Sequence, residues 1–167
     1  LGGRLAQDLV SRGGVEILLG SRGENRPPPT WLPETEVVQT LWKSMTNLQG
    51  ICKDVDVVLH LAAMNARDCL IAPDAAHEFN AIATRNLLEA AVHGGVKRFI
   101  YLSTAHVYGT PISGVITEES PTAPVGPYAT SKLAGEEAVR VAHKQEDIEG
   151  IVVRLSNSYG VPAHSQA

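Results

Sequence analysis

Two side chains capable of acid–base chemistry stand one helical turn apart in this sequence. Tyr128 and Lys132 are four residues apart in "YATSK", so on a helix they share a face. A nearby ammonium favours phenolate over phenol and would lower the pKa of Tyr128 toward the working range. The pair therefore predicts a proton donor and acceptor for an alcohol/ketone couple. The alternative is an ordinary pair on the surface of a helix.

A third hydroxyl precedes this pair, in the stretch "KRFIYLSTAHVYG". Thr104 follows an apolar run typical of a buried strand, and there it could hydrogen-bond a reacting oxygen. Alternatively, Ser103 and Thr104 satisfy backbone groups at the end of a strand. Because Tyr128 and Lys132 follow downstream, we favour catalysis by Thr104.

The elements that position these residues alternate between strand-like and helix-like segments. Apolar runs predict strands at 15–19, 36–41, 56–63, 97–103 and 150–156, and apolar spacing predicts helices over 5–10, 79–91 and 128–144. Residues 20–34, with three consecutive prolines, indicate an exposed loop. The alternation predicts an α/β protein with a Rossmann-type, doubly wound parallel sheet and helices on both faces. Ligands bind such sheets beyond the carboxyl ends of the strands, where His60, Thr104 and Asn157 stand.

The composition of the 167 residues fits one globular domain, because 44% are apolar and only 19% are charged. The net charge is -4 and the basic residues are dispersed, so the sequence has no basic patch of the kind that binds nucleic acid. No apolar run reaches the roughly 18 residues of a membrane span, and the first residues do not resemble a signal peptide. Cys52 and Cys69 lack metal-ligand spacing, so we expect no metal and reduced cysteines in a cytoplasmic protein.

The motifs together resemble the extended short-chain dehydrogenase/reductase family, in particular its NAD(P)-dependent nucleotide-sugar epimerase/dehydratase group. The matching stretches are "LGGRLAQDLV", "DVVLHLAA", "FNAIATRNLLEAA", "KRFIYLSTAHVYG", "PYATSKLAGEE" and "RLSNSYG". The resemblance implies an NAD(P)-binding Rossmann domain over residues 1–167, a small-molecule substrate of the nucleotide-sugar class, and a homodimer like those of many relatives.

The resemblance also implies roles for single residues. Thr104, Tyr128 and Lys132 would be catalytic, with Lys132 also holding the ribose hydroxyls of NAD or NADP. His106 and Asn157 would face the substrate. Further positions would line or support the cofactor: Gly2, Ser21, Arg22, Leu61, Ala62, Ala63, Asn80, Ser103, Leu155 and Ser156. For Asn80 the alternative is helix packing, for Ala62 and Ala63 it is a place in the core, and His60 is interpreted as the end of a strand.

Three departures from the family pattern limit these expectations. The phosphate-binding loop of the family has three glycines, and only the third has a counterpart, Gly2, so we expect a chain beginning at Leu1 to bind dinucleotide poorly. Most of the expected substrate-binding region lies beyond Ala167. Ser21 and Arg22 stand where an acid would favour NAD, so the choice between NAD and NADP stays open. The alternative interpretation of Arg22 is an ordinary solvated side chain.

Ala105 and His106 bear on the reaction. Sugar 4,6-dehydratases of the family carry an Asp-Glu pair after the catalytic threonine, and Ala105 cannot transfer a proton. This disfavours dehydration and leaves a nucleotide-sugar epimerase as the leading hypothesis. The alternatives are an NADPH-dependent keto-sugar reductase and a non-catalytic dinucleotide-binding module. His106 is either a second proton carrier or, as we favour, a residue that lines the pocket.

Overall fold

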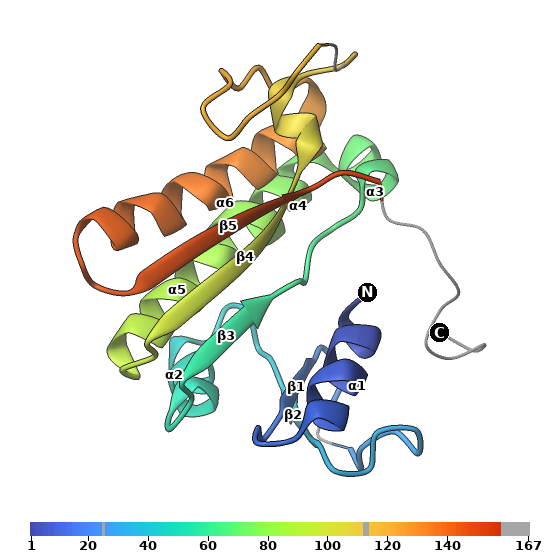
Figure 1. Ribbon diagram of the computed structural model, residues 1–167, viewed down its shortest axis with the longest axis vertical. Helices are drawn as coiled ribbons and strands as arrows, with labels where there is room; N and C mark the ends of the chain where they lie inside the picture. Colours follow the sequence, from blue (N-terminus) through green and yellow to red (C-terminus); the bar gives the residue numbers. More distant parts are fainter. Residues whose placement is uncertain (25, 112–113, 158–167) are drawn as a thin grey trace. The chain divides into compact units, whose positions relative to one another are not determined.

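The fold is given by a computed structural model that describes residues 1–24, 26–111 and 114–157 (Figure 1). The described chain divides into two compact units, residues 1–41 and residues 42–157. The first unit contains a parallel sheet and one helix and the second a parallel sheet with several helices, so the Rossmann-like α/β class predicted from the alternating pattern is confirmed. Among the described residues, no helix combines the length and the apolar character needed to cross a membrane.

The first unit contains one helix and two parallel strands. These are α1 (Gly2–Arg12), β1 (Leu18–Ser21) and β2 (Glu36–Gln39), with β1 and β2 paired from Leu18↔Glu36 to Ser21↔Gln39. The predicted strand at 15–19 is therefore displaced, because only the residues opposite β2 enter the ladder. Leu18 is 43% exposed, so the expected burial on both faces is wrong for β1, which among the described residues pairs with β2 alone. Within the predicted exposed loop, Leu32 is buried.

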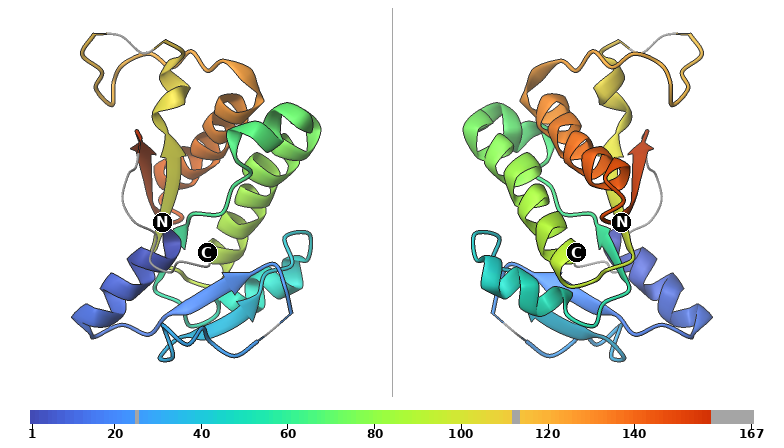
Figure 2. Two further views of the ribbon diagram at one scale, coloured as in Figure 1. Left: turned by 90° about the vertical axis from the view of Figure 1, so that its right-hand side faces the viewer. Right: turned by 90° about the vertical axis from the view of Figure 1, so that its left-hand side faces the viewer.

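The second unit is built on β3 (Val57–His60), β4 (Arg98–Thr104) and β5 (Glu149–Leu155), all parallel. Helices α5 (Ala83–His93) and α6 (Gly126–Lys144) cover one face of this sheet (Figure 2). Alternate residues of β4 point into the core under these helices, because side chains in a strand alternate between faces. The buried cluster consists of Leu48, Cys52, Leu87, Leu88, Ala90, Ala91, Val96, Phe99, Tyr101, Val139, Ala142 and Ile148.

The strands of the described residues form two sheets, β1-β2 and β3-β4-β5, and not the single continuous sheet that we expected. The usual Rossmann order 3-2-1-4-5-6 explains this grouping. When the five strands are taken as the second to sixth of that order, the pairs 3-2 and 4-5-6 are the ones observed.

Three short helices escaped the pattern-based prediction: α2 (Met45–Cys52), α3 (Ala66–Ile71) and α4 (Pro73–His77). They are too short to show an apolar stripe, and local signals mark their starts instead: side-chain caps for α2 and α3, and Pro73 in the first turn of α4. The hydroxyl of Ser44 accepts from the Asn47 amide at 3.3 Å, and the Asn65 side-chain oxygen accepts from the Asp68 amide at 3.0 Å. The two cysteines are free and buried, and burial raises the pKa of Cys52 to about 11.

Candidate active site

Thr104 ends β4 and is buried, with 5% of its surface exposed. Its hydroxyl oxygen accepts from the His106 amide at 3.2 Å and so caps a short 3₁₀ helix, Ala105–Tyr108. This is the structural role that the sequence left as an alternative. The same hydroxyl also interacts with the Tyr128 phenol and acts to lower its pKa. Thr104 thus combines a capping bond with a contact to the candidate proton donor.

Tyr128 lies in the first turn of α6 and is partly buried. Burial raises the pKa of its phenol, and the opposing effect of Thr104 does not cancel this, so the net direction is upward. The predicted lowering of the Tyr128 pKa by Lys132 is therefore wrong for the chain by itself. The physical reason is that desolvation of the phenolate outweighs the stabilising contacts.

Lys132 is buried one turn later on the same helix, with 2% of its surface exposed. Its ammonium lies 4.1 Å from the centroid of the Tyr101 ring, a cation–π arrangement. Burial lowers the pKa of Lys132 to about 8, although the carboxylate of Glu136 opposes the shift. At neutral pH this lysine is a buried ammonium held against an aromatic face.

Asn80 supports this arrangement from a π-helical turn, Glu78–Ile82, that interrupts the predicted 79–91 helix. Its side-chain oxygen accepts from the Met64 amide at 2.7 Å, and its side-chain nitrogen donates to the Ser131 hydroxyl at 3.0 Å. The Ser131 hydroxyl donates in turn to the backbone oxygen of Tyr128 at 3.0 Å. Asn80 therefore ties the segment after β3 to the first turns of α6, which fits the supporting role expected of it.

We expect Asn80→Ala to lower the free energy of unfolding by about 2–4 kcal/mol, since it removes the acceptor of the partly buried Met64 amide and one of the two partners of the buried Ser131 hydroxyl. Urea unfolding measures this. The matched control is Asn86→Ala, whose side chain makes one 3.5 Å hydrogen bond to the Trp42 oxygen; we expect it to cost less than about 1 kcal/mol. Equal losses in the two variants would contradict the tie described for Asn80.

Gly135 allows α6 to approach β4 closely. A Cβ added at Gly135 would lie 2.8 Å from the Cζ atom of Tyr101 and 3.0 Å from the backbone oxygen of Asn80. The Tyr101 hydroxyl donates to this Asn80 oxygen at 3.4 Å and to the Lys132 backbone oxygen at 3.3 Å. The glycine thus keeps the lysine-bearing turn against the end of the sheet.

His60, the last residue of β3, is a structural residue, as the sequence suggested. Its Nε2 lies 2.9 Å from the Thr84 hydroxyl, which donates to the Asn80 backbone oxygen at 2.8 Å. Because the Thr84 proton is used in that bond, Nε2 of His60 carries a proton and donates. Burial and the charge of Lys132 lower the pKa of His60 to about 3, so the ring is neutral at physiological pH.

Because the pKa of His60 is lowered in the folded chain, we expect the protein to lose stability in acid. The unfolded chain protonates His60 below its ordinary pKa of about 6.5, whereas the folded chain does so only near pH 3. Between these values the unfolded state binds more protons, so His60 makes stability fall by up to about 1.4 kcal/mol per pH unit as the pH drops. We expect His60→Gln to flatten the dependence measured by urea unfolding between pH 6.5 and 4. Parallel curves for the two proteins would exclude His60 as the source.

The remaining candidates of residues 42–157 lie at or just beyond the carboxyl ends of the three strands. Leu61, Ala62 and Ala63 continue the chain from β3, and both alanines are exposed. Leu155 ends β5 opposite Thr104, and Ser156 and Asn157 follow it, both exposed. His106 is also exposed, and its ring centroid lies 6.4 Å from that of Tyr128. The topology therefore gathers these positions at one edge of the sheet.

The side chains at this edge fit a nicotinamide nucleotide. The buried hydroxyl of Ser103 has no hydrogen-bond partner among the described residues, and buried polar groups ordinarily have one. The buried ammonium of Lys132 suits the ribose hydroxyls, and the small alanines leave room for a close approach of ligand to backbone.

Gly2, Ser21 and Arg22 belong to residues 1–41, so the structure does not place them relative to Tyr128. Gly2 is the first residue of α1. The Ser21 hydroxyl accepts from the Gly23 amide and from the side chain of Arg26, both at 3.2 Å, whereas Arg22 is exposed. Arg26 is a basic partner of Ser21 that sequence reasoning missed, although its place in the same loop was a usable signal.

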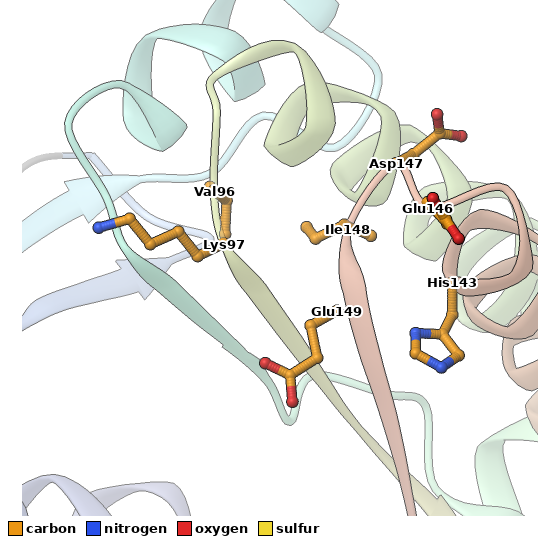
Figure 3. Close-up of a pocket in the computed structure, with 7 residues that line it drawn as sticks. All are labelled: Val96, Lys97, His143, Glu146, Asp147, Ile148 and Glu149. Atoms are coloured by element: carbon orange, nitrogen blue, oxygen red, sulfur yellow. The ribbon is translucent and has the colours of Figure 1, made fainter.

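A pocket of about 420 Å³ opens at the opposite, amino ends of β4 and β5 (Figure 3). It contains none of the candidates, and ligands of parallel sheets bind at the other end of the strands. Its lining residues are Val96, Lys97, His143, Glu146, Asp147, Ile148 and Glu149. Among the described residues, no group of three or more His, Cys, Asp and Glu side chains could hold a metal ion.

Comparison with known proteins matches the whole chain, residues 1–167, to the NAD dependent epimerase/dehydratase family. The chain is 39% identical over 106 residues to a dTDP-glucose 4,6-dehydratase of Streptomyces niveus, an alignment covering 63% of this chain and 32% of that protein. It is 33% identical over 149 residues to a UDP-glucose 4-epimerase of Azospirillum brasilense, covering 87% of this chain and 41% of that protein.

Among solved structures, the dTDP-glucose 4,6-dehydratase DesIV of Streptomyces venezuelae, with NAD and TYD bound, superposes with a TM-score of 0.82 and 28% identity. The superposition covers 99% of this chain and 54% of that one. The chain thus spans about half of the solved relative, and its alignments cover a third to two fifths of the two curated relatives.

Proposed function

Because the chain belongs to the NAD dependent epimerase/dehydratase family, we propose that it carries the catalytic part of an NAD(P)-dependent nucleotide-sugar epimerase. The observation that supports this is that Thr104 ends β4 and that Tyr128 and Lys132 lie on the first turns of α6, together with Ala105 at a position where the family resemblance implies an acid in dehydratases. The intact proton-transfer set argues against a non-catalytic dinucleotide-binding module, which needs no such set. Location in the cytoplasm and assembly as a homodimer remain predictions.

In the proposed reaction Tyr128 removes the proton of a sugar hydroxyl while Thr104 hydrogen-bonds the same oxygen. Ser103 and Lys132 would hold the nicotinamide nucleotide, which when bound would supply reversible hydride exchange at the carbon that carries this oxygen, from one face and back to the other. Tyr128 then gives the proton back to the oxygen of the inverted centre, so atoms and charge balance. The phenol pKa, raised by burial in the chain alone, must fall in the complex. Lys132 provides the positive charge for this, and it is protonated below its pKa of about 8.

Isotope labelling tests the proposal on protein expressed from the complete reading frame. A nucleotide sugar with deuterium on the reacting carbon is incubated with the protein, and the product is examined by NMR. An epimerase inverts the centre, retains the deuterium there and leaves the amount of NAD(P)H unchanged. Release of water with formation of a keto-deoxy sugar would identify a dehydratase and contradict the proposal.

A keto-sugar reductase is the second candidate, and one observation favours it. The guanidinium of Arg26 donates at 3.2 Å to the hydroxyl of Ser21, the last residue of β1, a position where an acid would select NAD. This basic pair suits the 2′-phosphate of NADP. Consumption of one NADPH for each product formed from a keto sugar would establish this activity in place of epimerisation.

A further inference from the structure

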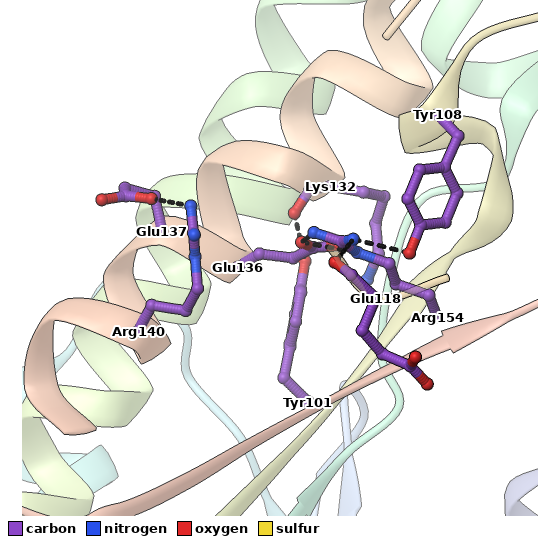
Figure 4. Close-up of polar contacts among 8 residues, drawn as sticks. All are labelled: Tyr101, Tyr108, Glu118, Lys132, Glu136, Glu137, Arg140 and Arg154. Carbon is purple, nitrogen blue, oxygen red and sulfur yellow. Dashed lines mark hydrogen bonds and ion pairs between the residues drawn. The ribbon is translucent and has the colours of Figure 1, made fainter. Parts of the chain in front are cut away.

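A buried ion pair lies one helical turn beyond Lys132. Glu136 is fully buried on α6, and both of its carboxylate oxygens accept from Arg154 of β5, at 3.0 and 3.1 Å from Nε and 2.7 Å from Nη2 (Figure 4). The Arg154 side chain is only 16% exposed. Burying two charges is costly, and well-packed apolar residues would often serve stability as well or better. Stability alone therefore does not explain why this ion pair is present.

The guanidinium also holds the last residue of the 3₁₀ helix and the segment that follows it. Its Nη1 donates to the Tyr108 hydroxyl at 2.7 Å and to the Glu118 backbone oxygen at 3.4 Å, and its carbon Cζ lies 4.7 Å from the centroid of the Tyr108 ring. The position of the Glu136 carboxylate is thus set by contacts from β5 and, through Arg154, from the segment after Thr104. It has little freedom to move away from Lys132.

The charges around Lys132 show what this carboxylate does. From α6 itself, Glu136 attracts the ammonium, while Arg154 of β5 is a second cation, held by Glu136. Tyr101 of β4 offers its ring face, His60 of β3 is neutral, and Cys69 of α3 and Tyr128 are uncharged thiol and phenol at neutral pH. Glu136 is therefore a buried carboxylate that pairs with the partly buried guanidinium of Arg154 and also attracts the buried ammonium of Lys132.

We propose that Glu136, fixed by Arg154, is a positioning residue that holds the Lys132 ammonium charged and in place against Tyr101. The inference rests on the proposed function, because Lys132 acts there as a cation. The sequence carried a signal for it: Glu136 follows Lys132 at helical spacing, and Arg154 interrupts the apolar run of β5. Neither residue needs to touch substrate or cofactor for this role.

The test is a pH titration of the Lys132 side chain by NMR, with ¹³C-labelled lysine and the signal assigned by its loss in Lys132→Met. We expect Glu136→Gln to lower the pKa of Lys132 by about one pH unit, the lower end of the shifts that a nearby opposite charge causes. The matched control is Glu137→Gln, the next residue of α6, whose carboxylate pairs with Arg140 on the exposed face (Figure 4). This control should leave the Lys132 titration unchanged.

Two further variants keep the test decisive. Glu136→Asp retains the charge and should restore most of the wild-type pKa. Arg154→Gln frees the carboxylate to act on Lys132 alone, so the pKa should rise, opposite in direction to Glu136→Gln, and this holds even if Glu136→Gln does not fold. An unchanged Lys132 titration in Arg154→Gln, or equal shifts in Glu136→Gln and Glu137→Gln, would overturn the proposal. Turnover is measured in a separate assay. A protein that does not catalyse the proposed reaction could still show the expected Lys132 titration, so the two failures can be told apart.

Discussion

Replacing Tyr128 by phenylalanine is expected to reduce turnover by about 10²–10⁴-fold, the usual contribution of a positioned acid or base. The substitution removes one oxygen from a partly buried ring and leaves the helix and the Lys132 contacts with Tyr101 intact. Binding of NAD(P) should therefore change little. Steady-state kinetics and equilibrium binding of the dinucleotide, both on protein from the complete reading frame, measure the two quantities.

Thr104 provides the matched comparison for this experiment. Thr104→Ser keeps the hydroxyl that contacts Tyr128 and caps the 3₁₀ helix, so it should retain turnover within about tenfold of wild type. Thr104→Val loses both contacts, so its turnover should fall well below that of Thr104→Ser. If Tyr128→Phe turned over substrate at the wild-type rate, the proton-transfer role of Tyr128 would be refuted whatever the Thr104 variants did.

Lys132→Met should give a protein that is more stable than wild type but unable to hold the dinucleotide productively. Burial lowers the pKa of Lys132 from 10.5 to about 8, which corresponds to a cost of about 3 kcal/mol for keeping the ammonium inside the folded chain. Methionine has a similar length and no charge, and Glu136 keeps its pairing with Arg154. After allowance for the lost contact with the Tyr101 ring, we expect a net stabilisation of about 1–3 kcal/mol at pH 7, measured by urea unfolding without cofactor.

The pH dependence of this difference supplies the check. Below pH 8 Lys132 is protonated in both states, so wild type carries the full cost. Between pH 8 and 10.5 the unfolded chain binds more protons than the folded chain, so wild-type stability rises with pH and the advantage of Lys132→Met shrinks. Lys144→Met, at the exposed end of α6, should shift stability by less than about 1 kcal/mol. A destabilised Lys132→Met protein at pH 7 would mean that the buried ammonium does not strain the fold.

Local sequence patterns anticipated much of the fold. Apolar runs located all five described strands to within a few residues, because buried parallel strands need continuous apolar side chains. The helical stripe anticipated α6, which begins at Gly126, two residues before Tyr128. The sequence pattern failed where the length or type of an element depends on contacts with another segment. The β1 ladder is limited by the length of β2, and the π-helical turn at Asn80 lies inside a stripe that appeared to be one helix.

The strand end at Thr104 and the helical spacing of Tyr128 and Lys132 are local properties, so the sequence predicted them directly. The pKa values of these side chains, in contrast, depend on the tertiary structure. Burial of Tyr128 raises its pKa, where the neighbouring lysine alone predicted a lowering, and burial makes Lys132 a strained ammonium. The pairing of Glu136 with Arg154 joins residues 18 positions apart through the packing of α6 on β5. Desolvation and contacts between distant segments depend on the folded chain as a whole, so no local pattern could supply them.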